Sequence, residues 1–319
     1  MTYVGLDQQV RSNNLKSSLL LAGFPALILI GVFAITYIFS IDEKGDPNMD
    51  IALGMFLETI PFVLAGVAVW FLIAFWGHSK MIDFATGSHT LERKDNMRVY
   101  NLTENLCMSV GMKMPKLKII ESPALNAFAS GLTEKNYTVT LTRGIINHLN
   151  DEELEGVIAH ELMHIRNKDV RLLVITIIFV GIFSLIVNIA FRTFLHSLFA
   201  NNRGRKNDGK GGGAAILVIL IVAVVIYFLS IIFKFALSRK REYMADAGAA
   251  QMTRNPMALA SALRKISGNH HLDVRNDDVQ EMFIENRPDD NSMGFLGGIG
   301  NLFATHPPIQ KRIQLLEQF

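Results

Sequence analysis

Two histidines and a glutamate, spaced closely enough to serve one metal ion, are the residues of this sequence best suited to chemistry. They lie in the run His160-Glu161-Leu162-Met163-His164. Histidines four positions apart project from one face of a helix, and imidazole is a common ligand of Zn²⁺. Glu161 neighbours the first histidine and is placed to take a proton from a metal-activated water as that water attacks a carbonyl. The pattern predicts a hydrolytic zinc site with Glu161 as general base.

A catalytic zinc ion normally has three protein ligands and leaves its fourth position to water. Asp169 follows the second histidine closely, but the helix is expected to end near it. Glu242 is the stronger candidate, because it begins an expected helix directly after an apolar segment. Asp246 lies one helical turn beyond Glu242 and is placed to hydrogen-bond a ligand histidine. His160 and Glu242 can meet only if the two apolar segments between them return the chain to the side that it left.

The histidines are expected on a helix that begins at Asn150. Asn150 is a favourable N-cap, and Glu153 follows three residues later, as in a capping box. Apolar residues recur at helical spacing through this segment, namely Leu154, Val157, Ile158, Leu162 and Ile165. Before it, residues 137–142 are rich in β-branched residues and predict a strand, with residues 126–129 as its partner. A small sheet is therefore expected beside the histidine helix.

Four apolar runs are long enough to cross a bilayer, which takes about 20 residues. They are residues 19–39, 51–76, 172–191 and 214–233. The alternative for any one run is a buried core helix, but four runs of this length favour a membrane protein. The second run carries one acidic residue, Glu58, which is either a functional group within the membrane or an interfacial one.

The expected organisation alternates membrane and polar parts. Residues 1–76 form an N-terminal membrane region with two transmembrane helices, 77–171 the first part of a catalytic domain, 172–237 a membrane helical pair with a glycine-rich loop, and 238–319 the second part of the catalytic domain. Basic residues near the N-terminus and in both polar parts place these parts in the cytoplasm. The loop 192–213 is also basic, so the last two runs either cross the membrane against this rule or form a hairpin that does not fully cross.

The composition of the chain argues against several classes of protein and of metal site. Of the 319 residues, 50% are hydrophobic and 19% are charged, which is unlike an ordinary soluble protein. The formal net charge is only +2 and no stretch interleaves basic with aromatic residues, which argues against nucleic-acid binding. The single cysteine, Cys107, excludes an internal disulfide and a cysteine-rich metal site.

In combination, these motifs resemble those of the HtpX-type membrane metalloproteases, which are related to the eukaryotic endopeptidases that trim prenylated CAAX proteins. The resemblance covers nearly the whole chain. It rests on both pairs of apolar runs, on Asn126-Ala127-Phe128-Ala129, on the histidine helix, on the segment from Glu242 to Asp246, and on Thr305-His306-Pro307-Pro308. It implies a mainly α-helical membrane protein with four transmembrane or membrane-embedded helices and a cytoplasmic zincin-like metallopeptidase domain that contains a small β-sheet.

The resemblance also implies roles for residues around the metal. Glu242 would be the third ligand of one Zn²⁺ per chain, and Asp246 would support the ligand histidines. His306 and Arg312 match a His-Pro-Pro segment followed by an arginine, and would stabilise the oxyanion.

A substrate would bind as an added β-strand along Asn126, Ala127 and Phe128, a mode that depends more on backbone than on side chains. The implied substrates are membrane and misfolded proteins, cleaved at the cell inner membrane in quality control and stress response, with self-cleavage during purification as a further sign of activity. Two alternatives stay open: a zinc-containing membrane scaffold without proteolysis, and a zinc hydrolase of a non-peptide substrate. Glu161 argues against the scaffold, because a structural site needs no base.

Overall fold

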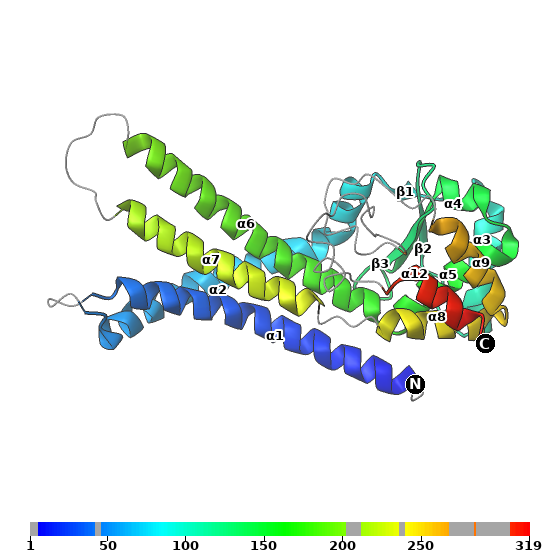
Figure 1. Ribbon diagram of the computed structural model, residues 1–319, viewed down its shortest axis with the longest axis horizontal. Helices are drawn as coiled ribbons and strands as arrows, with labels where there is room; N and C mark the ends of the chain where they lie inside the picture. Colours follow the sequence, from blue (N-terminus) through cyan, green and yellow to red (C-terminus); the bar gives the residue numbers. More distant parts are fainter. Residues whose placement is uncertain (1–5, 42–45, 202–211, 236–239, 268–283, 285–306) are drawn as a thin grey trace. The chain divides into compact units, whose positions relative to one another are not determined.

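The computed structural model describes residues 6–41, 46–201, 212–235, 240–267, 284 and 307–319, which are mainly helical with one small sheet (Figure 1). Contacts between residues divide the chain into two units. The first comprises Met1–Ser17, Gly77–Ile175 and Leu237–Phe319, and the second comprises Ser18–Trp76 and Thr176–Ala236.

Four long helices carry the apolar runs: α1 (Leu6–Phe39), α2 (Met49–Thr86), α6 (Asp169–Asn201) and α7 (Gly212–Phe235). In α1, α2 and α6, the segments Ala22–Phe39, Met49–Thr86 and Asp169–His196 are long and apolar enough to cross a membrane. The described part of α7 contains a shorter apolar stretch, Ile216–Leu229. The expectation of a membrane protein is confirmed, while a full crossing by α7 stays a prediction.

Aromatic side chains connect three of these helices within the second unit. The ring of Phe24 on α1 stacks on Phe179 of α6, with centroids 4.5 Å apart and planes 6° from parallel. Phe71 on α2 also stacks on Phe179, at 5.9 Å. Phe33 on α1 meets Phe56 on α2 edge-on at 5.3 Å. Offset and edge-on ring pairs of this kind add to the packing of α1, α2 and α6.

Two helices extend beyond their expected ends. The expectation of a loop over 192–213 was wrong for residues 192–201, which continue α6 to Asn201. The physical reason is that residues 192–203 contain no glycine or proline, the residues least favourable to a helix. Helix α2 likewise continues past Trp76 to Thr86.

The first unit contains a four-stranded sheet in the order β1-β2-β4-β3. Its strands are β1 (His89–Thr90), β2 (Lys116–Ile120), β3 (Ala127–Ser130) and β4 (Thr138–Thr142). The expected pairing of β3 with β4 is confirmed as antiparallel, and Gly131, with φ +117°, begins the turn between them. Strands β1 and β2, which the sequence did not predict, extend the sheet through a parallel pairing of β2 with β4.

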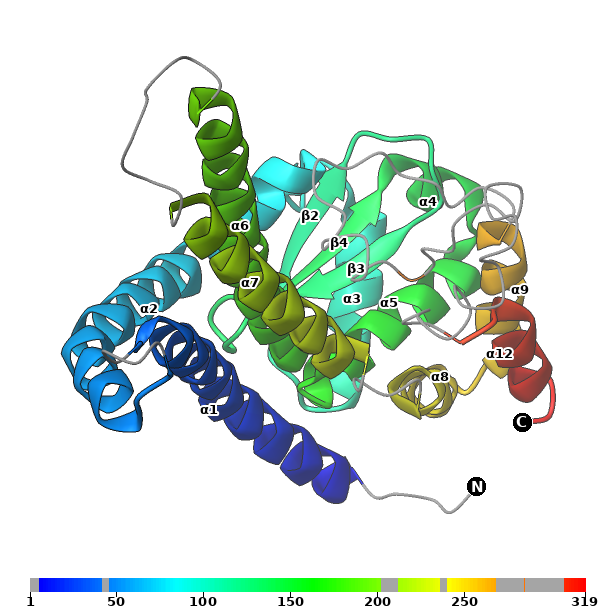
Figure 2. The same ribbon diagram turned by 60° about the vertical axis from the view of Figure 1, so that its left-hand side comes forward.

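Helix α5 (Asp151–Arg166) is the central helix of the first unit. It packs against β3 and β4 of the sheet and against other helices, namely α3 (Met97–Ser109), α8 (Lys240–Thr253) and α9 (Pro256–Ile266) (Figure 2). Helix α12 (Ile309–Leu316) packs on α8 and α9, and the short α4 (Arg143–His148) follows β4. The predicted capping box is confirmed: the Glu153 N–H donates to Asn150 Oδ1 at 2.8 Å, and the Asn150 N–H donates to Glu153 Oε2 at 3.0 Å.

Candidate active site

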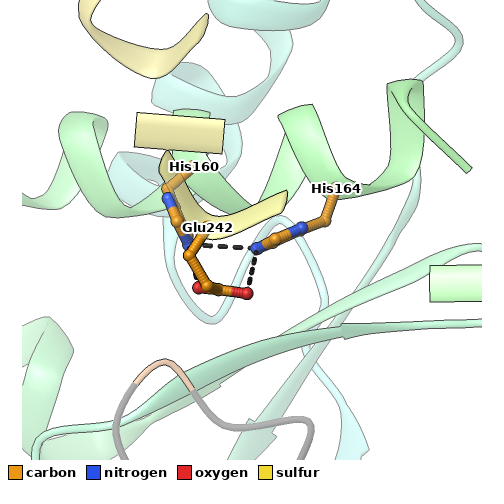
Figure 3. A group of neighbouring side chains, drawn as sticks. All are labelled: His160, His164 and Glu242. Carbon is orange, nitrogen blue, oxygen red and sulfur yellow. Dashed lines mark hydrogen bonds and ion pairs between the residues drawn. The ribbon is translucent and has the colours of Figure 1, made fainter. Parts of the chain in front are cut away.

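Side chains of His160, His164 and Glu242 converge on one point (Figure 3). The two Nε2 atoms lie 3.1 Å apart. His160 Nε2 lies 3.6 Å from Glu242 Oε2, and His164 Nε2 lies 3.6 Å from Glu242 Oε1. Ligand atoms placed tetrahedrally about 2.0–2.1 Å from an ion are roughly 3.3 Å from one another, so these spacings fit a single metal ion. Among the described residues, no other three histidine, cysteine or acidic side chains approach one another in this way.

Helices α5 and α8 supply the three side chains from positions far apart in sequence. Both histidines project from one face of α5, as their spacing predicts. Glu242 lies in the first turn of α8, which packs directly on α5. Gly248 permits this close approach, because a Cβ at that position would overlap the side chain of Met163 on α5.

A carboxylate lies behind each histidine, on the side away from the convergence point. His160 Nδ1 is 3.0 Å from Asp246 Oδ1, and His164 Nδ1 is 3.1 Å from Asp169 Oδ2. A carboxylate at Nδ1 holds the proton there and leaves Nε2 as the ligand atom. Asp246 therefore lies where the sequence suggested. Asp169, considered above as a possible third ligand, contacts the opposite nitrogen of His164 and does not join the cluster.

Arg312 on α12 reaches the same cluster and is 1% exposed. Its Nε and Nη2 donate to the two carboxylate oxygens of Asp246 at 2.8 and 2.7 Å. Nη2 is also 3.3 Å from His160 Nε2, and Nη1 is 3.7 Å from Glu242 Oε2. Burial raises the pKa of Asp246, but Arg312 and His160 more than offset this and lower it to about 2.

Two further titratable groups at the site, His164 and Glu161, have shifted pKa values. Burial lowers the pKa of His164, but Glu242 and Asp169 raise it more strongly, to about 10. The acidic surroundings thus favour a positive charge at this position, which a metal ion can supply in place of a proton. Burial raises the pKa of Glu161, which is 2% exposed and neighbours the first ligand. A carboxyl group with a raised pKa is suited to holding and releasing a proton.

The expected substrate-binding residues lie at the start of strand β3. Asn126 immediately precedes β3, and Ala127 and Phe128 begin this edge strand; each of the three is 1% exposed. His306 lies outside the described residues. His148, a histidine near the site in sequence, contacts the Gly144 carbonyl through Nδ1 at 2.9 Å, a local backbone contact.

The role of one residue near the site, and the presence of another, were missed by reasoning from the sequence. Asp169 was found as an acidic residue but not as the partner of His164 Nδ1; its signal was a carboxylate five residues beyond a ligand histidine. Ile284 hydrogen-bonds through its backbone to Ala127 and to Arg312, and no pattern in the sequence marks such contacts.

Comparison with known proteins gives consistent results along the chain. The family model described as "Peptidase family M48" matches residues 93–319. The Protease HtpX homolog of Bacteroides fragilis is 52% identical over 325 residues, covering 100% of both chains. The Protease HtpX homolog of Lactobacillus acidophilus is 33% identical, covering 98% of this chain and 99% of that protein.

A solved structure, that of S. mikatae Ste24p, aligns with 97% of this chain and 66% of its own, at 20% identity and a TM-score of 0.46. The family model spans both metal-binding segments, and the full-length relatives carry the same name at 52% and 33% identity. The chain therefore belongs to peptidase family M48, as a membrane metalloprotease of the HtpX type.

Proposed function

We propose that this metalloprotease is a zinc-dependent endopeptidase in which His160, His164 and Glu242 hold one Zn²⁺ per chain. The observation that carries the proposal is the convergence of three ligand atoms from α5 and α8, with Glu161 next to the first ligand and outside the cluster. Three protein ligands leave one position open, as a catalytic zinc site requires and a structural one normally does not.

The metal ion and the side chains around it have different roles in hydrolysis. Bound Zn²⁺ would supply a Lewis acid that lowers the pKa of a water molecule and polarises a peptide carbonyl. The Glu161 carboxylate accepts the proton of the attacking water and then donates it to the nitrogen of the leaving amine. Arg312 brings a buried positive charge beside the cluster and stabilises the negative charge that develops on the carbonyl oxygen. His306 is proposed to assist Arg312, on the resemblance alone.

The edge strand β3 is the proposed binding site for an extended substrate. Among the described strands it pairs with β4 alone, so the backbone groups on its other side point away from the sheet, where a further strand could bond. Recognition through backbone hydrogen bonds tolerates varied side chains, which suits membrane and misfolded proteins as substrates. The same tolerance makes cleavage of a second copy of the chain an expected side reaction.

The proposed location is the cell inner membrane, with the catalytic part in the cytoplasm. The support is the distribution of basic residues: Arg11 and Lys16 precede the first apolar run, and Arg93, Lys94 and Arg98 follow the second. The short segment between those runs, residues 42–46, is acidic on balance. Both polar parts therefore lie on the side that the rule assigns to the cytoplasm.

The proposal is tested with the full-length protein in detergent, loaded with zinc, and with unfolded casein and a model membrane protein as substrates. Glu161→Gln is expected to retain stoichiometric zinc and to lose cleavage by at least about a hundredfold, because a general base contributes about 10²–10⁴-fold. Glu242→Ala is expected to lose both zinc and cleavage. Glu152→Gln, an exposed position of the same helix, is the matched control and is expected to behave as the unmodified protein.

Three outcomes would contradict the proposal. Full casein cleavage by Glu161→Gln would show that Glu161 is not the general base. Full zinc content in Glu242→Ala would show that Glu242 is not the third ligand. Zinc-loaded protein that cleaves neither substrate would favour the scaffold, or, if it cleaves a small ester, the non-peptide hydrolase. A chelator is expected to abolish cleavage and added zinc to restore it.

A further inference from the structure

The outer side of strand β3 is already occupied at one position. The carbonyl of Asn126 accepts a hydrogen bond from the Thr142 N–H of β4 at 3.0 Å, so the backbone groups of the next residue point away from β4. That residue is Ala127, and its carbonyl accepts a hydrogen bond from the backbone N–H of Ile284 at 2.9 Å. Ile284 thus bonds to the sheet edge where an added strand would bond.

The other backbone group of Ile284 is held on the side of the metal cluster. Its carbonyl accepts a hydrogen bond from Arg312 Nη1 at 3.2 Å, and the same Nη1 is 3.7 Å from Glu242 Oε2. Ile284 is 2% exposed, so its aliphatic side chain is buried as well. One residue is therefore held between the edge strand and the arginine at the cluster by both of its backbone groups.

We propose that Ile284 occupies the position of a substrate residue, so that a substrate peptide competes with the chain itself for the Ala127 carbonyl and for Arg312. The inference rests on the proposed function, and it deepens it in two ways. It assigns a backbone subsite made of an acceptor, the Ala127 carbonyl, and a donor, Arg312 Nη1. It also assigns the residue that binds there: one with an aliphatic side chain, since Ile284 is buried in that place.

The same contacts would also arise if Ile284 were a permanent brace for Arg312. The two explanations differ in what a substrate does. A brace must stay in place for the site to work, so weakening its bond to Ala127 would impair the binding of peptides. A competitor must leave, so weakening the same bond would improve it.

Binding is measured rather than cleavage, so that this inference can fail independently of the proposed function. The probe is a fluorescent peptide of residues 280–288 of this chain, titrated by anisotropy into the zinc-loaded Glu161→Gln protein. Concentrations reach the millimolar range, because a tethered competitor has an effective concentration of about that order. Two second substitutions are compared: Ile284→Pro removes the N–H that bonds to Ala127, and Ile284→Val keeps it with an aliphatic side chain.

The peptide is expected to bind the Ile284→Pro protein about tenfold or more tightly than the Ile284→Val protein. A peptide N-methylated at its isoleucine nitrogen is expected to lose that affinity, because it cannot donate to Ala127. Equal or weaker binding to the Ile284→Pro protein overturns the inference in favour of the brace. If Ile284→Pro does not fold, the Ile284→Val protein decides: displacement of the peptide by unfolded casein supports the inference, and absence of displacement or equal binding of the N-methyl peptide overturns it.

Discussion

Arg312 and Asp246, 66 positions apart in sequence, form a doubly hydrogen-bonded ion pair between α12 and α8. Asp246 in turn contacts His160 Nδ1 at 3.0 Å. The C-terminal helix is thereby connected to the first ligand histidine through a single carboxylate. Both members of the pair are nearly inaccessible to water, at 1% and 6% side-chain exposure. The pair therefore bears on the stability of the protein and on the orientation of its metal ligand.

Arg312→Met is expected to destabilise the protein by about 3–5 kcal/mol, because it leaves the Asp246 carboxylate buried without its cation. Arg264→Met is the control: Arg264 forms an ion pair with Glu317 near the same helix, but its side chain is 47% exposed. Exposed pairs of this kind contribute about 0–1 kcal/mol. Chemical unfolding of both variants in detergent gives the comparison. Equal destabilisation of the two variants would contradict a stabilising role for the buried pair of Arg312 and Asp246.

Asp169→Asn is expected to lower zinc affinity by about 10–100-fold, because it removes the carboxylate that holds the proton on His164 Nδ1. Asp169 is also the first residue of α6, so loss of a charge at a helix N-terminus must be separated from loss of the contact. Asp151→Asn provides that control, since Asp151 is the first residue of α5 and contacts neither histidine. Competition with a chelator measures the affinities. Equal zinc affinity in the two variants would contradict a role for Asp169 in positioning His164.

The carboxylate of Glu153 predicts a pH dependence of stability. Burial raises its pKa, but hydrogen bonds from Lys265, Ser261 and the Asn150 backbone offset this, so the pKa is lowered in the folded protein. A lowered pKa contributes stability above the unfolded value of about 4.3, and that stability is lost as pH falls through the folded value. The difference in unfolding free energy between the unmodified protein and Glu153→Gln is therefore expected to be constant near neutrality and to shrink in acid.

The measurement is chemical unfolding of both proteins between about pH 7 and pH 3. The exposed neighbour Glu152 serves as the control position, and Glu152→Gln should show a smaller difference at neutral pH. A difference that grows in acid would have the wrong sign for a group with a lowered pKa and would contradict the assignment.

Local signals predicted the elements that carry the ligands. The start of α5 followed from Asn150 and Glu153, whose hydrogen bonds join residues three positions apart. The pairing of β3 with β4 followed from the β-branched residues of 137–142 and the neighbouring segment 126–129. The HELMH spacing placed both histidines on one face of a helix. In each case, the interactions that decide the local structure lie within a few residues.

Features that depend on distant contacts were missed or left open. Strand β2 has the sequence Lys-Leu-Lys-Ile-Ile and pairs in parallel with β4. Strand β3 comes between these two strands in the sequence, but in the sheet it lies on the far side of β4. Asp169 contacts His164 across the junction of α5 and α6, where Lys168 has φ 61°, a conformation unusual for a lysine. The contacts of Ile284 to Ala127 and Arg312 span still longer separations. No periodicity encodes such contacts.

Gly156 on α5 lies where the histidine helix packs closely against α9. A Cβ at Gly156 would lie 3.2 Å from the N, Cα and Cβ atoms of Leu259 on α9. Two of these atoms are backbone, so the neighbour cannot turn aside as a flexible side chain would. Alanine gains about 1 kcal/mol over glycine in a helix interior, but overpacking costs about 1–3 kcal/mol. Gly156→Ala is therefore expected to be neutral to destabilising by up to about 2 kcal/mol, the difference of these two terms.

Gly77→Ala on α2 separates the gain in helix propensity from the cost of overpacking. A Cβ there would meet only the Met81 sulfur at 3.9 Å, an ordinary contact, so the helix-propensity gain is expected without the packing cost. The unfolding midpoint should therefore rise for Gly77→Ala and not for Gly156→Ala. Zinc content should stay unchanged in both, since neither substitution alters the side chain of a ligand. If Gly156→Ala stabilises the protein as much as Gly77→Ala, then α9 yields to the added methyl group, and the close approach of α5 and α9 is not what holds the histidine helix in place.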